Sequence, residues 1–383
     1  MRQGKCIGTG LLWLMLVVVV TAQETWMPVL SRPDTLPKEH AGGLFLRLSN
    51  NNFLFDAEYF SPLEVGYTWI GLQLQPEVVW QYSEHFLLRG GVYLLKYSGR
   101  DDVTDVRPVL AAVYRFSPRV TLVMGSLYGS LNHGLPQPLY RYDRSMADWP
   151  EEGVQLLVNT TRLKGDYWLQ WRNFILPGDP FQEQLVFGTS SRLFLMDRDG
   201  WRLVMPLSTM VHHQGGQIDS SPEPVHTYGN LGGGLTLRRH LGEGVLKAAE
   251  GSLLYFHYFD ASGQPLYYDV TSGHGIWVKA TVHLSNLEAG AGYWYGRDFY
   301  SFLGEPLFAS VSEHSAGKVY PVRSLLTYRL AYAKELEKGI SITLYGNGYQ
   351  DLRLRRFDYN VGLQLLFHVD VRIPLKKRDI RDE

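Results

Sequence analysis

The sequence predicts an all-β protein, a single antiparallel up-and-down β-barrel of about sixteen strands (about 14 to 18) that spans a membrane. Three features predict it: long runs of alternating apolar and polar residues, connections that are alternately short and long, and an aromatic content of 13% in a chain of mean hydropathy -0.15. Beyond the first apolar run, no stretch has the roughly 20 apolar residues of a membrane-spanning helix.

The final strand shows the alternation most clearly. From Phe357 to Ile373 every odd-numbered residue is apolar, and most even-numbered residues are polar. A period of two residues predicts a strand with one apolar and one polar face. The run exceeds the roughly five or six residues of a typical soluble strand and is long enough to cross a bilayer at a tilt. Similar alternation over 70–82, 276–284 and 326–332 predicts a wall with lipid outside and water inside.

The connections between these runs are of two kinds, short and long. Short links such as Ser117-Pro118-Arg119 and Asp197-Arg198-Asp199-Gly200 alternate with much longer segments. In a membrane barrel the tight turns face the periplasm and the long loops face outward. The barrel is therefore expected over residues 44–373, with both ends in the periplasm. The long connections are Tyr97 to Arg107, Ser130 to Gly153, Phe174 to Gln184, Ser208 to Gly229, Asp260 to Gly275 and Arg297 to Val322.

The first residues predict export. Basic residues precede an apolar run from Leu11 to Val20, and small residues follow it, so residues 1–22 are expected to be a cleaved signal peptide. Cys6 is the only cysteine, which excludes a disulfide-stapled module from the exported part. Residues 23–43, rich in Pro and charge, form either a periplasmic arm or a plug, and residues 374–383 form a charged tail. A net charge of -1 argues against nucleic-acid binding.

Taken together, these features give the chain a resemblance to Gram-negative outer-membrane β-barrels, and in particular to their porin-like members. The resemblance is one of pattern across nearly the whole exported chain, and the aromatic and glycine content is similar to that of Bacteroidetes barrels. It implies a location in the cell outer membrane, contact with its lipid and lipopolysaccharide, and insertion by the barrel-assembly machinery. The chain departs from the pattern where Pro374-Leu375-Lys376 follow the last strand, because such barrels usually end on an aromatic residue.

The charges predicted to line the lumen suggest a function. A cationic wall favours anions, so we expect a porin-like channel for small polar, anionic solutes and no enzyme. The same wall also carries acidic residues, which could pair with the cations listed below across a plugged lumen. They are Asp56, Glu58, Glu77, Glu288, Asp358 and Asp370. The seven predicted lumen-lining cations are Arg89, Arg115, Arg172, Arg202, Arg238, Lys279 and Arg329.

Two other functions remain open. The long loops could bind or assemble a surface polysaccharide or other glycan, a lipid or a partner protein. Alternatively, the outer wall could hydrolyse lipid, with His133 or His314 as base beside a hydroxyl or amide. His212, His213 and His226 could bind a divalent cation, but a solvated polar loop is the favoured interpretation, and the acidic loop residues lack the spacing of a calcium loop. No cofactor or metal is therefore expected.

Overall fold

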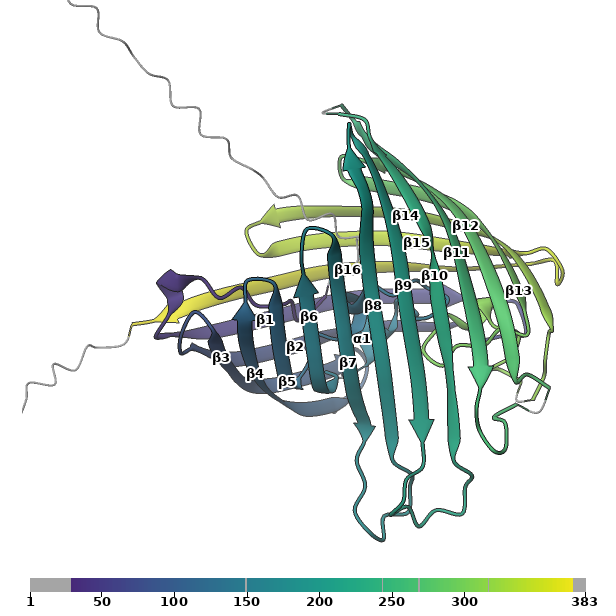
Figure 1. The fold of residues 1–383 in the computed structure, drawn as a ribbon, viewed down its shortest axis with the longest axis horizontal. Coiled ribbons are helices and arrows are strands. Elements are labelled where there is room, and N and C mark those ends of the chain that lie inside the picture. Colours follow the sequence, from purple (N-terminus) through teal and green to yellow (C-terminus); the bar gives the residue numbers. More distant parts are fainter. Residues whose placement is uncertain (1–28, 149, 243, 268, 316, 375–383) are drawn as a thin grey trace, which may run out of the picture.

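The computed structural model describes residues 29–148, 150–242, 244–267, 269–315 and 317–374, so the predicted signal peptide and almost all of the tail lie outside the described residues. Within these ranges sixteen strands form one closed antiparallel barrel (Figure 1), which confirms the predicted fold class and strand number. Each strand pairs with the next in sequence, and β16 closes the wall against β1. The strands are β1 (Gly43–Glu58), β2 (Tyr67–Gln81), β3 (Phe86–Tyr97), β4 (Asp105–Ser117), β5 (Val120–Ser126), β6 (Glu152–Asn159), β7 (Leu163–Asn173), β8 (Gln184–Arg198), β9 (Trp201–Gln214), β10 (His226–His240), β11 (Leu246–Asp260), β12 (Ser272–Leu284), β13 (Leu287–Arg297), β14 (Val322–Glu337), β15 (Ile340–Asp351) and β16 (Arg356–Ile373).

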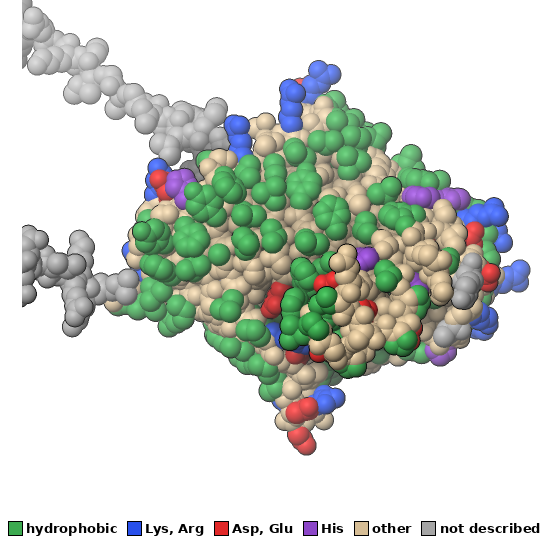
Figure 2. Space-filling view, turned by 60° about the horizontal axis from the view of Figure 1, so that its bottom comes forward, with side chains coloured by type: hydrophobic (Ala, Val, Ile, Leu, Met, Phe, Trp, Pro, Cys, Tyr) green, Lys and Arg blue, Asp and Glu red, His purple; other side chains and the backbone are tan. Residues whose placement is uncertain are grey.

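The two faces of the wall follow the predicted alternation. On β16, Phe357 is 47% exposed and Val361 39% exposed, whereas Asp358, Asn360 and Gln364 are buried. Hydrophobic side chains are spread over the face of the wall that Figure 2 shows. Because polar groups point inward and apolar groups outward, the barrel is built for lipid outside rather than for a second protein layer.

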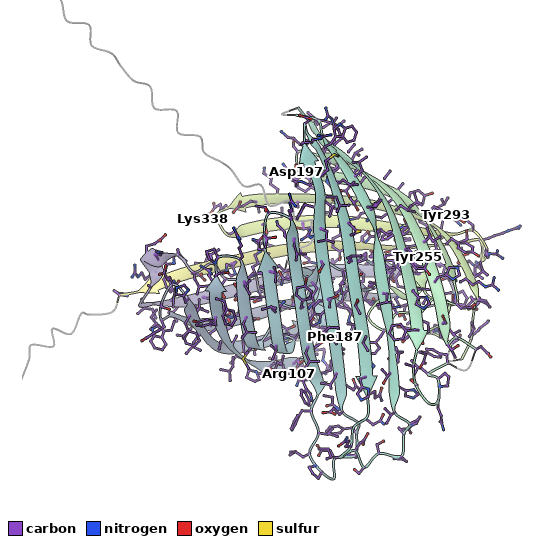
Figure 3. All side chains as sticks on the ribbon, viewed as in Figure 1. Arg107, Phe187, Asp197, Tyr255, Tyr293 and Lys338 are labelled. Atoms are coloured by element: carbon purple, nitrogen blue, oxygen red, sulfur yellow. The ribbon has the colours of Figure 1, made fainter. Side chains whose placement is uncertain are left out.

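The connections divide between the two ends of the barrel. Leu44 pairs with Ile373, so the chain enters and leaves the wall at one end. Short turns lie at that periplasmic end, and Asp197 and Lys338, labelled in Figure 3, lie at two of them. The longest connections, loop L3 (127–151) and loop L7 (298–321), lie at the extracellular end.

Four short helices complete the described secondary structure. They are η1 (Lys38–His40) before β1, η2 (Ser130–His133) and α1 (Arg144–Ala147) in L3, and η3 (Pro306–Phe308) in L7. None of the helices in the described ranges is both long enough and apolar enough to cross a membrane.

Loops L3 and L7 fold inward and fill the extracellular half of the lumen. Leu139 and Met146 of L3 are fully buried, as are Leu307 and Phe308 of L7. The loops also pair with each other, because the Arg141 amide donates to the Leu303 carbonyl at 2.8 Å and the Glu305 amide donates to the Gln137 carbonyl at 3.0 Å. L3 and L7 therefore form one packed plug.

The segment before β1 occupies the lumen from the other side. Asp34 forms an ion pair with Arg47 of the wall at 2.7 Å and accepts a hydrogen bond from the Tyr128 hydroxyl at 2.6 Å. The Asn132 amide of L3 donates to the Ser31 carbonyl at 2.7 Å. The part of the predicted arm or plug that the structure describes thus lies inside the barrel, between the wall and L3.

Candidate functional site

The structure places all seven predicted cations on the lumen-facing side of the wall, but it does not bring them together. Arg89 lies 3.5 Å from Glu77 and 3.7 Å from Asp34, with its guanidinium 4.7 Å from the centre of the Tyr128 ring. Arg115 donates to the Leu36 carbonyl at 3.0 Å. These two cations hold the N-terminal segment in the lumen and do not line an open channel.

Two further cations contact the plug or a turn. The guanidinium of Arg172 lies 5.4 Å from the centre of the Phe302 ring in L7. Arg202 donates twice to the Asp197 carboxylate, at 2.7 and 2.9 Å, beside the β8–β9 turn. Neither lines the cavity that the other three cations share.

The remaining three, Arg238, Lys279 and Arg329, line one cavity of about 70 Å³ beneath the plug. Arg329 pairs with Glu288 at 3.1 Å, and Arg238 lies 3.9 Å from Glu250. The Lys279 ammonium lies 4.5 Å from the centre of the Trp277 ring. Selectivity for anions remains a prediction for this cavity alone.

The placement of two acidic residues was wrong. Glu77, Glu288 and Asp358 are buried on the lumen side. Asp56 and Glu58, however, lie on the outward side of β1. Near its extracellular end β1 turns aromatic side chains into the lumen, including Phe55 against Tyr67 at 5.7 Å. Polarity therefore no longer marks the lumen face there.

His133 lies in the lumen and not on the outer wall. Its ring is stacked on Trp168 at 3.6 Å, and its nitrogens lie 2.9 Å from Asp166 and 3.0 Å from Glu151. Burial opposes the charge, but the two carboxylates outweigh it and raise the pKa of His133 to about 10. The imidazolium anchors L3 to the wall. His314 lies exposed in L7, so neither histidine fits the predicted outer-wall hydrolase.

A second charged group joins the extracellular loops. Arg141 of L3 pairs with Asp143 at 2.9 Å, with Glu64 at 3.3 Å and with Glu313 of L7 at 3.8 Å. Burial raises the pKa of Glu305 to about 8 and that of Glu313 to about 7, although Arg141 opposes both shifts. This cluster links L3, L7 and the β1–β2 loop by ion pairs.

The lipid-facing side carries a hydroxyl next to a carboxylate. Thr68 of β2 pairs in register with Asp56 of β1, and its hydroxyl donates to the Asp56 carboxylate at 2.5 Å. Both side chains point outward at the extracellular end of their strands. A hydroxyl beside a proton acceptor is the minimal arrangement for nucleophilic acyl transfer. Sequence reasoning missed the pair because it assigned Asp56 to the lumen.

Two asparagines interrupt the lipid-facing side of β1 further down. Asn50 and Asn52 point outward, and their cross-strand neighbours include Leu72 and Leu365. The Asn52 amide donates to Asn50 at 2.5 Å, and the Asn50 amide donates to the Gln73 carbonyl at 2.9 Å. Amides cost free energy in an apolar wall even when they are partly paired. Their even-numbered positions among leucines were a sequence signal for this.

An outward-facing hydroxyl also lies beside an imidazole at the extracellular ends of β9 and β10. The His213 ring lies 2.8 Å from the Thr227 hydroxyl. The neighbouring His212 points inward, 4.1 Å from the Phe302 ring, so His213 must point outward. Across the described ranges, no three His, Cys, Asp or Glu side chains are grouped so as to hold a metal ion.

Comparisons with known proteins extend this description. A family model described as lipid A 3'-O-deacylase-type matches residues 36–377. No curated protein matches the chain. The outer-membrane protein OprD of Pseudomonas aeruginosa is 13% identical over 91% of this chain and 97% of its own, with a TM-score of 0.50. OpdQ of the same organism is 13% identical over 86% and 99%, with a TM-score of 0.51. A loop-deletion mutant of the Vibrio cholerae outer-membrane protein OmpT is 10% identical over 86% and 100%, with a TM-score of 0.50.

These matches decide three of the expectations. The structural neighbours share the fold, and they confirm a porin-like barrel in the outer membrane. The expectation that the protein is not an enzyme was wrong, because the matching family is of a deacylase type, and deacylases are enzymes. The alternating pattern of a membrane wall is common to channels and enzymes, so it could not separate the two.

Proposed function

The chain belongs to the lipid A 3'-O-deacylase-type family, and from this premise we propose that it removes an ester-linked acyl chain from an outer-leaflet glycolipid of the lipid A class. The reaction takes place on the outer wall of the barrel. The observation that carries the proposal is the Thr68 hydroxyl, which donates to Asp56 at 2.5 Å on the side of the wall that faces lipid.

The position of the pair suits an ester of a membrane lipid. Such an ester joins the sugar headgroup to an acyl chain, so it lies at the boundary between water and hydrocarbon. Thr68 is the second residue of β2 at the extracellular end, and Ile70 below it is 49% exposed on the same face. The acyl chain would lie along this apolar surface while the ester reaches Thr68.

The chemistry follows that of other activated hydroxyls. Asp56 accepts the proton of the Thr68 hydroxyl as the oxygen attacks the ester carbonyl. The ester C–O bond breaks, the sugar oxygen leaves with that proton, and the acyl group stays on Thr68. Water then attacks the acyl group and passes a proton to Asp56. The bond to the Thr68 oxygen breaks, Asp56 returns the proton to that oxygen, and the fatty acid is released. The closed lumen takes no part in these steps.

The test is fatty-acid release from lipid A by the purified full-length barrel in vesicles, followed by mass spectrometry. Thr68→Ala is expected to lower the rate at least about 10³-fold and Asp56→Asn at least about 10²-fold, the usual range for a nucleophile and its base. Thr209→Ala, which removes an outward-pointing hydroxyl from β9, is the matched control and should keep the wild-type rate.

The competing outer-wall pair gives the test a second arm. If Thr227→Ala and His213→Ala abolish release while Thr68→Ala does not, the reaction is assigned to the wrong strands. Fatty-acid release that is unchanged in Thr68→Ala, Asp56→Asn, Thr227→Ala and His213→Ala would contradict an outer-wall hydroxyl mechanism.

Passage of small anionic solutes is a second candidate function. The cavity lined by Arg238, Lys279 and Arg329 favours it, because three cations face it beneath the plug. Liposome swelling with sized sugars and their acids would show size-limited flux that is faster for the acids. Absence of flux together with retained glycan binding would instead favour loops that bind surface polysaccharide.

A further inference from the structure

We infer that the tip of the β15–β16 hairpin is a binding surface for the phosphate groups of an outer-leaflet glycolipid. This surface, called here the arginine tip, consists of Arg353, Arg355 and Arg356. The inference deepens the proposed function and rests on it, because it names the feature of the substrate that is recognised beside Thr68.

The three guanidinium groups are exposed and uncompensated. All three arginines are exposed, and none of their guanidinium groups forms an ion pair or a hydrogen bond with a described residue. Only the backbone of Arg353 and Arg356 is hydrogen-bonded to side chains, those of Asp351 and Gln350. Figure 2 shows Lys and Arg side chains gathered at the end of the molecule where this hairpin lies in Figure 1. Guanidinium groups match phosphate oxygens in geometry and can bind them through paired hydrogen bonds.

The nearest carboxylates in sequence are both directed inward. Asp351 pairs with the buried Arg323 at 2.9 Å and accepts the backbone amide of Leu354 at 2.7 Å. Asp358 accepts the backbone amides of Phe60 and Ser61 at 2.6 and 2.8 Å. Both are 1% exposed. The hairpin thus uses its acidic residues to fix its own shape and leaves its basic residues to the outside.

The backbone of the tip includes one residue in a conformation that is unfavourable for any residue other than glycine. Arg355 has a φ of 55°, in the left-handed region that glycine adopts most readily. A non-glycine residue there costs on the order of 1 kcal/mol. The turn keeps an arginine there despite this cost.

The tip lies at the level of the lipid headgroups. Leu352 is 46% exposed and Phe357 is 47% exposed, on either side of the arginines. An aromatic ring and an apolar side chain beside cations are typical of the boundary between hydrocarbon and headgroups. Phosphates of the outer leaflet would therefore meet the arginines without leaving the membrane surface.

The tip lies beyond the proposed catalytic pair, toward the extracellular side. Val361 of β16 and Thr68 of β2 both pair with Asp56 of β1. Arg356 is therefore about 10 Å from Thr68 across the sheet and about 17 Å further out along the strands. One glycolipid molecule could contact the arginine tip with its headgroup and present an ester to Thr68.

The experiment measures lipid A binding without turnover. The full-length Thr68→Ala barrel in detergent is titrated with lipid A carrying its phosphates, and binding is followed by native mass spectrometry. Changing Arg353, Arg355 and Arg356 to Gln is expected to raise the Kd at least tenfold and to reduce its salt dependence. Lipid A stripped of phosphate should bind the parent and this triple variant equally weakly.

The matched control changes three exposed arginines at the periplasmic end, Arg119, Arg162 and Arg198, to Gln, and should leave the Kd unchanged. Arg355→Gly tests the tip again, because it relieves the backbone and should weaken binding while the barrel remains at least as stable. Equal Kd values for the parent and the tip variants would overturn the inference, as would equal weakening in the control. If the wild-type protein releases no fatty acid but binding still depends on the tip, only the proposed function fails.

Discussion

The two sides of the barrel wall treat charge differently. Inside, cations have partners: Arg47 pairs with Asp34 at 2.7 Å and Asp370 at 2.8 Å, and Arg323 pairs with Asp351 at 2.9 Å. Outside, the guanidinium groups of the arginine tip form no ion pair with any described residue, and Asp56 has the Thr68 hydroxyl as its side-chain partner instead of a cation.

The difference follows from desolvation. A charge enclosed between the wall, L3 and L7 loses its water and must be paired. The interior charges therefore form ion pairs that stabilise the packing of the lumen. A charge at the membrane surface keeps its water and needs no partner, which leaves it available for a ligand. The comparison shows that a basic residue predicted to face the lumen does not necessarily line a channel, because it can be held in an internal ion pair.

The largest effect is expected when the cation of an interior ion pair is removed. His133→Ala leaves the buried Glu151 and Asp166 carboxylates without their shared cation, which should destabilise the anchored form of L3 by about 3 to 5 kcal/mol. Release of L3 would appear as faster protease cleavage within 127–151 and as raised ion conductance. His314→Ala, in exposed L7, should change neither property. Equal effects of the two substitutions would refute a structural role for the interior pair.

The same anchor predicts a pH dependence. The folded pKa of His133 is raised to about 10 from 6.5, so its stabilisation is fully present below pH 6.5 and is lost as the pH rises through 10. Protease cleavage of L3 should therefore increase over that window in the wild-type protein. In His133→Gln the increase should be much smaller. A flat wild-type profile would contradict the assignment of an imidazolium there.

Glu305 tests the contact between L3 and L7, called here the latch, in which its backbone amide donates to the Gln137 carbonyl. The expected change in stability is smaller than that for His133. Burial raises its pKa from 4.5 to about 8, so the folded latch favours the protonated acid and loses stability as the pH rises from 4.5 toward 8. Glu305→Gln, which mimics the neutral acid, should flatten that part of the profile and stabilise the latch above pH 8. The readout is thermal unfolding of the barrel between pH 4 and 9. A steeper profile in the variant would be the contrary result.

The smallest effect concerns the lipid-facing asparagines. Replacing Asn50 and Asn52 with Leu should stabilise the barrel by about 1 to 3 kcal/mol, because it removes amides from an apolar wall. Asn347→Leu is the matched control on the inner face, where the amide donates to Asn360 at 2.7 Å and its oxygen accepts from Arg329 at 3.0 Å. That variant should be destabilised. Urea unfolding in detergent compares the two faces directly.

The fold was largely predictable, because a membrane wall forces a two-residue period on every strand. The last strand, expected from Phe357 to Ile373, was found as Arg356–Ile373, and the barrel expected from residue 44 begins at Gly43. The sizes of the connections predicted which end of the barrel carries the short turns and which carries the long loops. The contents of the lumen could not be read in this way, since L3 and L7 fold inward through contacts between residues far apart in the chain.

The site was less predictable. Period alone placed the seven cations on the inner face but could not show that Arg89 binds Asp34 of the plug. Asp56 was assigned to the wrong face because polarity was equated with the lumen, and Phe55 breaks that rule. Recognition of Thr68 required knowledge of which β1 residue it faces, which strand register supplies and sequence spacing does not.

Mass spectrometry of the protein itself tests the central claim most directly. The wild-type barrel is mixed with lipid A in vesicles, quenched within milliseconds and digested, and the peptides are searched for a covalently attached acyl group. An acyl group on Thr68 during turnover is the predicted result. An acyl group on Thr227 or on a residue of the lumen, with Thr68 unmodified while fatty acid is released, would contradict the account.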